Sequence, residues 1–184
     1  MKIKKSIAVF LDRDGVLSRT NVINGKSYAP RTISEFKLLP GVKKSVDKLK
    51  EVGYLVIVVT NQPDIGNGLI NENIVEMMHK KLSKKTNITK IYVCPHKQQE
   101  NCVCRKPNPG MLLEAAFEFG IDLGKSFMVG DRASDIEAGV KAGCSAIFLN
   151  RHYSEPLPQK QICTVSSLLK AVDYILATRL KGKL

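Results

Sequence analysis

The sequence predicts an α/β protein: one three-layer domain with a parallel sheet between two layers of helices. Five short apolar runs are rich in valine and isoleucine and lack polar–apolar alternation, which is typical of strands buried on both faces of a parallel sheet. Segments with helical spacing separate these runs, and the alternation indicates the three layers. With 184 residues, 43% of them hydrophobic, the chain can bury a core, so we expect a single domain over 1–184.

The elements are justified in chain order. The apolar runs predict strands over 7–11, 55–59, 91–94, 127–129 and 146–149. The first helix is predicted after Pro40, carries Val42, Val46 and Leu49 at helical spacing, and ends before Gly53. Similar spacing predicts further helices over 72–83, 110–119, 134–142 and 166–177.

Two stretches, 18–39 and 94–109, do not fit this pattern because turn residues, prolines, cysteines and charges interrupt them. Both follow predicted strands. We therefore expect both to lie at the carboxyl edge of the sheet, where open α/β folds bind their ligands.

The formal net charge of +12 raises the question of a nucleic-acid ligand. The lysines are spread over several predicted helix faces with no interleaved aromatic side chains, which argues against a polymeric nucleic acid. A basic surface also attracts small anions over a long range, and this suits a phosphorylated metabolite as the substrate.

The N-terminal segment and the cysteine content indicate the cellular compartment in which the protein works. The N-terminal apolar run is about half the length that a membrane span needs. No small-residue cleavage site follows it, so it predicts a strand rather than a signal peptide, and no membrane partner. Five cysteines, an odd number, favour reduced thiols over a secreted disulfide framework. We expect a cytoplasmic monomer.

Asp12 and Asp14 stand directly after the first predicted strand, and Gly15 lets the chain turn sharply. One interpretation is a solvated turn, because Asp and Gly are common turn residues. The other is chemical: one carboxylate attacks phosphorus, while the other donates a proton to the leaving group and then takes one from water. Two carboxylates this close repel each other, so a divalent cation between them is expected.

More polar side chains follow later strands at the same predicted edge. Thr60, Asn61 and Gln62 follow the second strand and offer neutral donors to a phosphoryl oxygen. Lys106 precedes a helix, where its ammonium can neutralise charge on a transferring group. These residues predict a phosphate-binding edge.

Asp131 and Asp135 follow the fourth predicted strand, where Asp131 has the alternative role of a helix cap. With them, four motifs occur in the order DxDG, TNQ, RKP and GDxxxD. This order resembles the phosphatases of the haloacid dehalogenase superfamily, over roughly 7–150 of the chain. The resemblance implies a capless, Rossmann-like parallel sheet.

The resemblance also implies roles for individual residues. Asp12 would be the nucleophile that carries an aspartyl-phosphate, and Asp14 the general acid and base. Thr60 would bind the phosphate, and Lys106 would stabilise its charge. Magnesium would be held by Asp12, the backbone carbonyl of Asp14 and Asp131, inside an oxygen shell that Asp135 orients from outside.

A second cluster of potential metal ligands lies within eleven residues of chain: Cys94, His96, Cys102 and Cys104. These are four nitrogen and sulfur ligands, a complete set for structural, tetrahedral zinc; the alternative is that the thiols are simply buried. The cluster runs into Arg105 and Lys106, so a bound zinc would fix where both cations point. The other two cysteines lie in apolar contexts and are predicted to be in the core: Cys144 and Cys163.

The CxH and CxC pairs followed by RKPxPGM narrow the resemblance to the subfamily of heptose-bisphosphate and histidinol-phosphate phosphatases. The sequence is closer to the heptose enzymes, which implies removal of the 7-phosphate of D-glycero-D-manno-heptose 1,7-bisphosphate in surface-polysaccharide precursor synthesis. Arg105 would bind substrate, as would Arg132 and the amides of Asn61 and Gln62. The chain departs from the heptose pattern at Pro63-Asp64 and Asn67, on loops expected to face the substrate.

Three other functions stay open. Histidinol phosphate is the alternative substrate. Removal of phosphate from nucleic-acid ends would unite the basic charge with the catalysis, and activity on terminally phosphorylated oligonucleotides would reveal it. A protein of another class, a zinc-stabilised basic nucleic-acid-binding protein on an inactive phosphatase scaffold, would bind oligonucleotides in a salt-sensitive way without releasing phosphate. His79 and His152 have no partners at ligand spacing, and we interpret both as structural.

Overall fold

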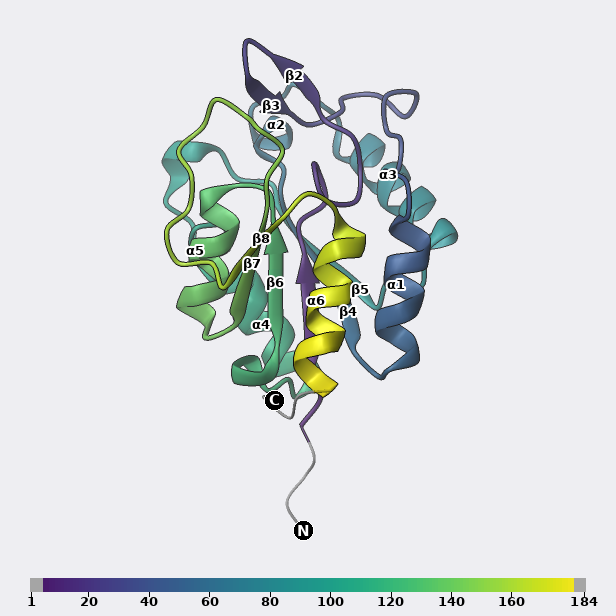
Figure 1. The fold of residues 1–184 in the computed structure, drawn as a ribbon. Helices are drawn as coiled ribbons and strands as arrows, with labels where there is room; N and C mark the ends of the chain where they lie inside the picture. Colours follow the sequence, from purple (N-terminus) through teal and green to yellow (C-terminus); the bar gives the residue numbers. More distant parts are fainter. Residues whose placement is uncertain (1–4, 181–184) are drawn as a thin grey trace.

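A six-stranded parallel sheet forms the centre of the computed structural model, which describes residues 5–180 (Figure 1). The strand order is β5-β4-β1-β6-β7-β8. The strands are β1 (Ala8–Leu11), β4 (Leu55–Asn61), β5 (Lys90–Cys94), β6 (Phe127–Gly130), β7 (Ser145–Leu149) and β8 (Cys163–Val165). The three-layer α/β fold expected from the sequence is confirmed. The remaining residues of the predicted domain, 1–4 and 181–184, lie outside the described part.

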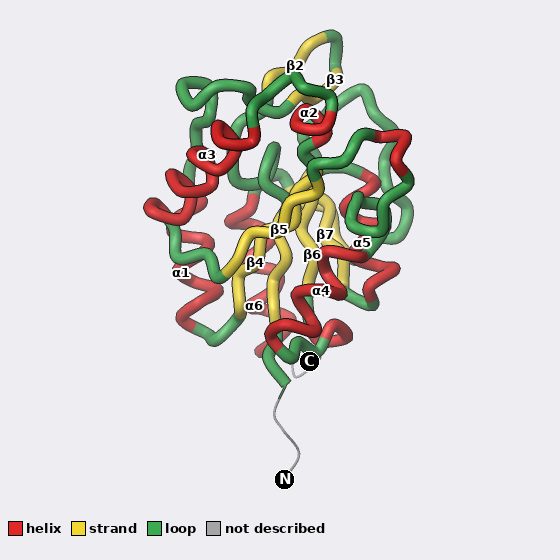
Figure 2. Tube along the Cα trace, turned by 180° about the vertical axis from the view of Figure 1, so that it is seen from behind, coloured by secondary structure: helices red, strands yellow, loops and turns green. Residues whose placement is uncertain are grey.

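Helices cover both faces of the sheet (Figures 1 and 2). Helices α1 (Val42–Glu51), α3 (Glu72–Lys85) and α6 (Leu168–Leu180) bury their apolar sides in one core. Helices α4 (Gly110–Phe119) and α5 (Ala133–Ala142) bury theirs in a core on the other face. Because successive side chains of a strand point to opposite faces, each central strand supplies both cores.

Strand β1 illustrates this arrangement. Val9 and Leu11 belong to the core of α1, α3 and α6, whereas Ala8 and Phe10 belong to that of α4 and α5. All four side chains are fully buried. Burying each large one contributes about 1.5–3 kcal/mol, so the strand that carries Asp12 is fixed firmly between two cores.

Several short elements were not predicted. The irregular stretch 18–39 contains a hairpin of β2 (Asn21–Ile23) and β3 (Lys26–Tyr28), a short helix α2 (Pro63–Gly66) follows β4, and β8 lies at the sheet edge. The two hairpin strands have three residues each, of which only Ser27 is buried, so they leave little hydrophobic pattern. The hairpin did leave a turn signal, because Asn24 and Gly25 have φ of 49° and 75°, the left-handed conformations that a tight hairpin turn needs.

The two cysteines predicted to be in the core differ. Cys144 is 7% exposed, so its prediction is confirmed. Cys163 starts the edge strand β8 and is only partly buried, packed against the core rather than inside it. An edge strand has one neighbour, which leaves its side chains less covered.

Candidate active site

A hollow of about 680 Å³ opens at the carboxyl edge of the sheet, and residues of β3 are part of its lining. Figure 1 shows the β2–β3 hairpin above this edge. The hollow lies where β1, β4 and β6 end, at the edge where parallel sheets bind ligands. Its walls include eight residues singled out from the sequence: Asp12, Asp14, Thr60, Asn61, Gln62, Arg105, Lys106 and Arg132. Motifs up to 120 residues apart are therefore brought to one site.

Lys106 is the buried cation of this site, with 2% of its surface exposed. Its Nζ donates to Asp12 Oδ1 at 2.5 Å and to the carbonyl oxygen of Val59 at 2.8 Å, and lies 2.6 Å from Asp135 Oδ1. Burial opposes its charge, but the two carboxylates outweigh burial and raise the pKa of Lys106 above its usual value. The ammonium therefore stays charged beside Asp12.

Three carboxylates, from Asp12, Asp131 and Asp135, offer oxygens that lie within 4.8 Å of one another. Burial raises the pKa of Asp12 to about 6, although Lys106 opposes the shift. Burial and the charges of Asp12 and Asp135 raise the pKa of Asp131 well above its usual range. A cluster of buried carboxylates whose ionisation is this costly is suited to a bound cation.

The carboxylate oxygens of Asp131 are available to bind a metal ion, whereas those of Asp135 are already occupied. Both carboxylate oxygens of Asp131 are buried without a hydrogen-bond partner among the described residues. Asp135 Oδ2 accepts from the backbone N–H of Asp131 and Arg132, at 3.1 and 3.0 Å, while its Oδ1 pairs with Lys106. Asp135, rather than Asp131, therefore caps α5. The geometry leaves Asp131 to a ligand and gives Asp135 a supporting position.

Asp14 is held by a dense set of donors. Arg13 donates to both of its oxygens at 3.0 and 2.7 Å, Ser18 Oγ donates to Oδ1 at 2.7 Å, and Gln62 Nε2 donates to Oδ2 at 2.8 Å. Burial opposes ionisation, but the charge of Arg13 and these hydrogen bonds outweigh it and lower the pKa of Asp14. The structure thus holds Asp14 as a carboxylate, the form that accepts a proton.

The two amides after β4 connect these groups. Asn61 Nδ2 donates to the carbonyl oxygen of Lys106, and its Oδ1 accepts from the backbone N–H of Lys106, at 3.0 and 3.1 Å. Gln62 Nε2 donates to Thr60 Oγ1 at 3.0 Å as well as to Asp14. Both side chains line the hollow and also fix the residues predicted to act on phosphate.

A hydrogen bond and an ion pair tie the hairpin region to the rim of the hollow. Arg132 Nη2 donates to the carbonyl oxygen of Ser27 and lies 3.3 Å from Glu155. Arg31 Nε donates to Asp64 Oδ2 at 2.7 Å. Asp64 is one of the departures from the heptose pattern, and the structure gives it a partner at the rim.

The predicted zinc ligands also come together, in the loop after β5. Cys94 Sγ lies 3.6 Å from His96 Nδ1 and 3.5 Å from Cys102 Sγ; Cys104 Sγ lies 3.2 Å from His96 Nδ1 and 3.5 Å from Cys102 Sγ. All four ligand atoms lie within 4.8 Å of one another, and the thiols are free. This donor set is suited to a tetrahedral metal ion.

Known proteins resemble this chain over most of its length. A family model described as HAD-hydrolase-like matches residues 103–158. A D-glycero-beta-D-manno-heptose-1,7-bisphosphate 7-phosphatase from Haemophilus influenzae is 39% identical over 146 residues, which are 73% of this chain and 76% of that protein. The Escherichia coli protein of the same name is 37% identical over 181 residues, 92% of this chain and 87% of that protein. The chain belongs to the haloacid dehalogenase-like hydrolases.

A solved member of this hydrolase family has the same fold. The D,D-heptose 1,7-bisphosphate phosphatase from B. bronchiseptica, complexed with magnesium and phosphate, is 25% identical with a TM-score of 0.79. The match covers 93% of this chain and 98% of that one. No described helix is long and apolar enough to cross a membrane.

Several residues of this hydrolase site were missed or underrated from the sequence. Gly15 has a φ of 86°, and a Cβ there would lie 1.8 Å from Asp131 Oδ2, so glycine is required for close approach. Arg13 is fully buried against Asp14, and its other end reaches His79. The position of Arg13 between Asp12 and Asp14 was the one feature of the sequence that could have indicated its role. The sequence could not indicate the contact with His79, because that residue is 66 positions away.

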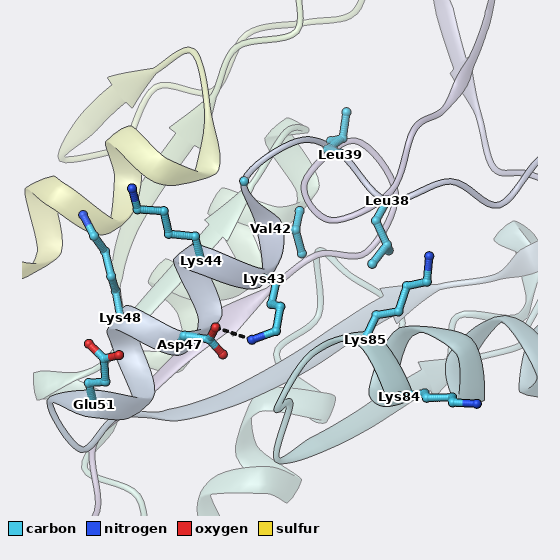
Figure 3. Close-up of a pocket in the computed structure, with 11 residues that line it drawn as sticks. Leu38, Leu39, Val42, Lys43, Lys44, Asp47, Lys48, Glu51, Lys84 and Lys85 are labelled. Atoms are coloured by element: carbon cyan, nitrogen blue, oxygen red, sulfur yellow. Dashed lines mark hydrogen bonds and ion pairs between the residues drawn. The ribbon is translucent and has the colours of Figure 1, made fainter.

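A second hollow lies between α1 and α3, outside the hydrolase site (Figure 3). Its lining combines apolar side chains and lysines with two carboxylates: Leu38, Leu39, Val42, Lys43, Lys44, Asp47, Lys48, Glu51, Lys84 and Lys85. Figure 3 shows Lys44 and Lys48 on one side and Lys84 and Lys85 on the other, so the ammonium groups do not converge. This groove, called the lysine groove below, contains no catalytic constellation among its described residues.

Proposed function

We propose that this hydrolase is a magnesium-dependent phosphatase that removes the 7-phosphate of D-glycero-β-D-manno-heptose 1,7-bisphosphate through an aspartyl-phosphate on Asp12. One observation carries the chemistry: the Asp12 carboxylate ends β1 with a buried lysine 2.5 Å from one oxygen and the unpartnered carboxylate of Asp131 nearby. The printed names of the relatives support the substrate and its β anomer.

In the first step, an oxygen of Asp12 attacks phosphorus and the bond from phosphorus to the sugar oxygen breaks. The leaving oxygen takes a proton from the protonated form of Asp14, which is the minor form because the donors around Asp14 favour its carboxylate. Lys106 balances negative charge on Asp12 and on the transferring group, because its Nζ is already in contact with Oδ1. Thr60 and the backbone at the end of β4 supply donors to the phosphoryl oxygens.

In the second step, water attacks the phosphorus of the aspartyl-phosphate, and the bond from phosphorus to the Asp12 oxygen breaks. The water gives its proton to Asp14, and inorganic phosphate leaves. The hydrogen bonds to Asp14 favour its carboxylate form, which is the form this step needs. One residue thus acts as acid and then as base.

Magnesium fits the carboxylates near Lys106. We assign it to oxygens of Asp12 and Asp131 and to the backbone carbonyl of Asp14, because hard oxygen ligands suit this ion and both oxygens of Asp131 are orphaned. When bound, it would neutralise the carboxylates and polarise the phosphoryl group. Asp135 would keep its place behind Asp131 and Lys106.

Zinc fits the four-residue cluster. Tetrahedral bonds of about 2.3 Å to sulfur place neighbouring sulfur atoms about 3.8 Å apart, close to the 3.5 Å between the paired thiols. With four protein ligands the site has no open position, so the ion would be structural. It would hold Arg105 and Lys106, which follow Cys104 directly.

The rest of the hollow is assigned to the sugar and its second phosphate. Arg105 lines the hollow and has a buried Nη1 without a hydrogen-bond partner among the described residues, which suits an anionic oxygen. Arg132 also lines the hollow, held by Ser27 and Glu155. The pair of Arg31 and Asp64 would bound the sugar on the α2 side.

We further propose a monomer with one domain over 1–184 that works in the cytoplasm. Both cores share one sheet, which supports a single folding unit. The five cysteines form no disulfide, and reduced thiols are typical of that compartment. Light scattering on the purified protein tests the monomer.

Phosphate release tests the proposed function. We expect magnesium-dependent turnover of the heptose bisphosphate, with the β anomer preferred, and a specificity constant about 100-fold or more above that for histidinol phosphate. A terminally phosphorylated oligonucleotide should release no phosphate. Preferred turnover of histidinol phosphate or of the oligonucleotide would reject the assigned substrate while keeping the chemistry. Folded, metal-loaded protein with no turnover of any phosphate ester would reject the phosphatase itself.

A further inference from the structure

Arg13 connects the acid–base residue to a histidine outside the site motifs. It is the largest fully buried side chain in the described part of the chain. Its Nε and Nη2 bind the two oxygens of Asp14, and its Nη1 lies 3.0 Å from Nε2 of His79 on α3. The guanidinium carbon lies 5.5 Å from the centre of the Phe36 ring. All three guanidinium nitrogens are thus engaged.

The contact with His79 has only one chemical arrangement. Arginine donates hydrogen bonds and accepts none, so Nε2 of His79 must accept and the ring proton must lie on Nδ1. Burial and the nearby charge of Arg13 lower the pKa of His79 to about 4, although Asp14 opposes the shift. The ring is therefore neutral at physiological pH and offers the lone pair that Arg13 needs.

The guanidinium of Arg13 is planar, so its contact with His79 also determines how it is oriented toward Asp14. The fork formed by Nε and Nη2 matches a carboxylate only in one relative orientation of the two planes. Fixing Nη1 fixes the plane of that fork. Without an acceptor at Nη1, a buried donor is unpaired, and the guanidinium gains by turning toward another acceptor. Asp14 would turn with it.

We propose that His79 is a positioning residue for proton transfer: it accepts a hydrogen bond from Arg13 and thereby fixes the guanidinium that orients Asp14. The inference rests on the proposed function, in which Asp14 gives a proton to the leaving oxygen and takes one from water. His79 belongs to α3, whose apolar residues Val75, Met78 and Leu82 pack in the core. The helix thus couples the core to the acid–base residue.

The test compares two variants of the full chain on two substrates. His79→Leu removes the acceptor, whereas His79→Gln keeps a side-chain oxygen at similar reach. One substrate is an alkyl phosphate that the wild type hydrolyses, and the heptose bisphosphate is the first choice. The other is p-nitrophenyl phosphate, whose phenolate leaves without protonation. The rate of enzyme phosphorylation is measured by acid quench in a single turnover with magnesium present, beside KM and thermal unfolding. His152→Gln is the matched control on an exposed histidine.

General acid catalysis is worth about 100-fold or more, and loss of its positioning should cost part of that. We expect His79→Leu to slow phosphorylation by the alkyl phosphate about 10-fold with KM within about twofold, and by the aryl phosphate less than twofold. His79→Gln should restore the alkyl rate to within about threefold of wild type. If His79→Leu does not fold, His79→Asn, whose amide is too short to reach Nη1, replaces it.

Equal slowing of both substrates would mean that His79 supports only the fold, and an unchanged alkyl rate in His79→Leu would mean that Arg13 holds Asp14 alone. Either result overturns the inference. The parallel variant Asp14→Asn separates the two proposals. If it abolishes alkyl turnover while His79→Leu does not slow it, only the positioning role fails. If Asp14→Asn retains full alkyl turnover, the acid–base role of Asp14 fails, and the positioning role with it.

Discussion

The active site and the lysine groove both carry several cations, but they hold them differently. In the active site, Lys106 is 2% exposed and its ammonium contacts two carboxylates and a carbonyl oxygen. In the lysine groove, the side chain of Lys43 is 71% exposed and pairs with Asp47 alone, at 2.6 Å (Figure 3). Buried, convergent charges interact strongly, whereas exposed pairs are screened and contribute little. A region is therefore suited to catalysis when its charged groups are buried and converge on one point, and not merely when it contains many of them.

The largest difference should appear on removing one carboxylate from each region. Asp12→Asn removes the proposed nucleophile, so we expect kcat to fall by about 10⁴-fold or more. Asp47→Asn, in an exposed pair on α1, should leave kcat within about twofold, because such pairs barely affect the fold. Phosphate release under magnesium saturation measures both. Substantial turnover by Asp12→Asn would contradict the distinction.

Removing the two lysines sharpens the comparison. Lys106→Met takes away the cation beside Asp12, and we expect kcat to fall by about 10²- to 10³-fold, as for loss of one preorganised charge stabiliser. Lys43→Met should not change it. Circular dichroism and thermal unfolding verify that both variants are folded. A loss of stability without a loss of kcat in the folded fraction would assign Lys106 to structure alone.

The cysteine cluster extends the comparison to the loop that delivers Lys106. Cys104→Ser should lower the zinc content and reduce kcat by about 10²-fold, since small displacements of catalytic groups have effects of that size. Cys163→Ser, at the sheet edge, is the matched control and should retain both. Metal analysis and phosphate release are measured on the same preparations. Full activity in zinc-free protein would show that the loop carrying Lys106 adopts its active conformation without the metal.

Histidine ionisation gives a smaller, pH-dependent contrast. The pKa of His79 is lowered to about 4 from an ordinary value of 6.5 by burial and by Arg13, with Asp14 opposing. Between these values the unfolded chain binds a proton that the folded chain excludes, so stability falls as pH falls from 6.5 to 4. We expect this share, up to about 3 kcal/mol of unfolding free energy, to be absent in His79→Gln. Urea unfolding of both proteins at several pH values measures it; parallel curves would contradict the shift.

The smallest effects should come from the lysine groove. Changing Lys43 and Lys44 together to glutamine should alter the free energy of unfolding by less than about 1 kcal/mol and leave phosphate release unchanged. We also expect only weak, salt-sensitive binding of oligonucleotides that these changes reduce further. Tight oligonucleotide binding that depends on the groove would give it a function of its own.

The sequence predicted the sheet and most of its helices because apolar runs and helical spacing survive in local patterns. Helix α4 begins and ends where the spacing predicted. It also identified the eight predicted residues that line the site, since most of them follow a strand directly and parallel strands end at one edge. It did not reveal the contacts between motifs. Asn61 was predicted as a substrate ligand, but its bonds to the backbone of Lys106 depend on β4 lying beside that loop.

His79 shows most clearly that long-range contacts could not be predicted from the sequence. It lies 66 residues from Arg13, and nothing near it in sequence marks it as part of a site. The β2–β3 hairpin was also missed because its strands have only three residues each and bury no apolar side chain, so no hydrophobic pattern was available. Local rules therefore recover elements and motifs, while contacts made by a few buried polar groups require the fold.

The most direct test of the central claim is to trap the covalent intermediate. Asp14→Asn lacks the base for hydrolysis, and an aryl phosphate needs no acid, so mixing the two with magnesium and quenching in acid should leave phosphate on the enzyme. Mass spectrometry of the digested protein should find it on Asp12 and nowhere else. Phosphate on another residue, or continued release of inorganic phosphate by Asp12→Asn, would contradict an aspartyl-phosphate on Asp12.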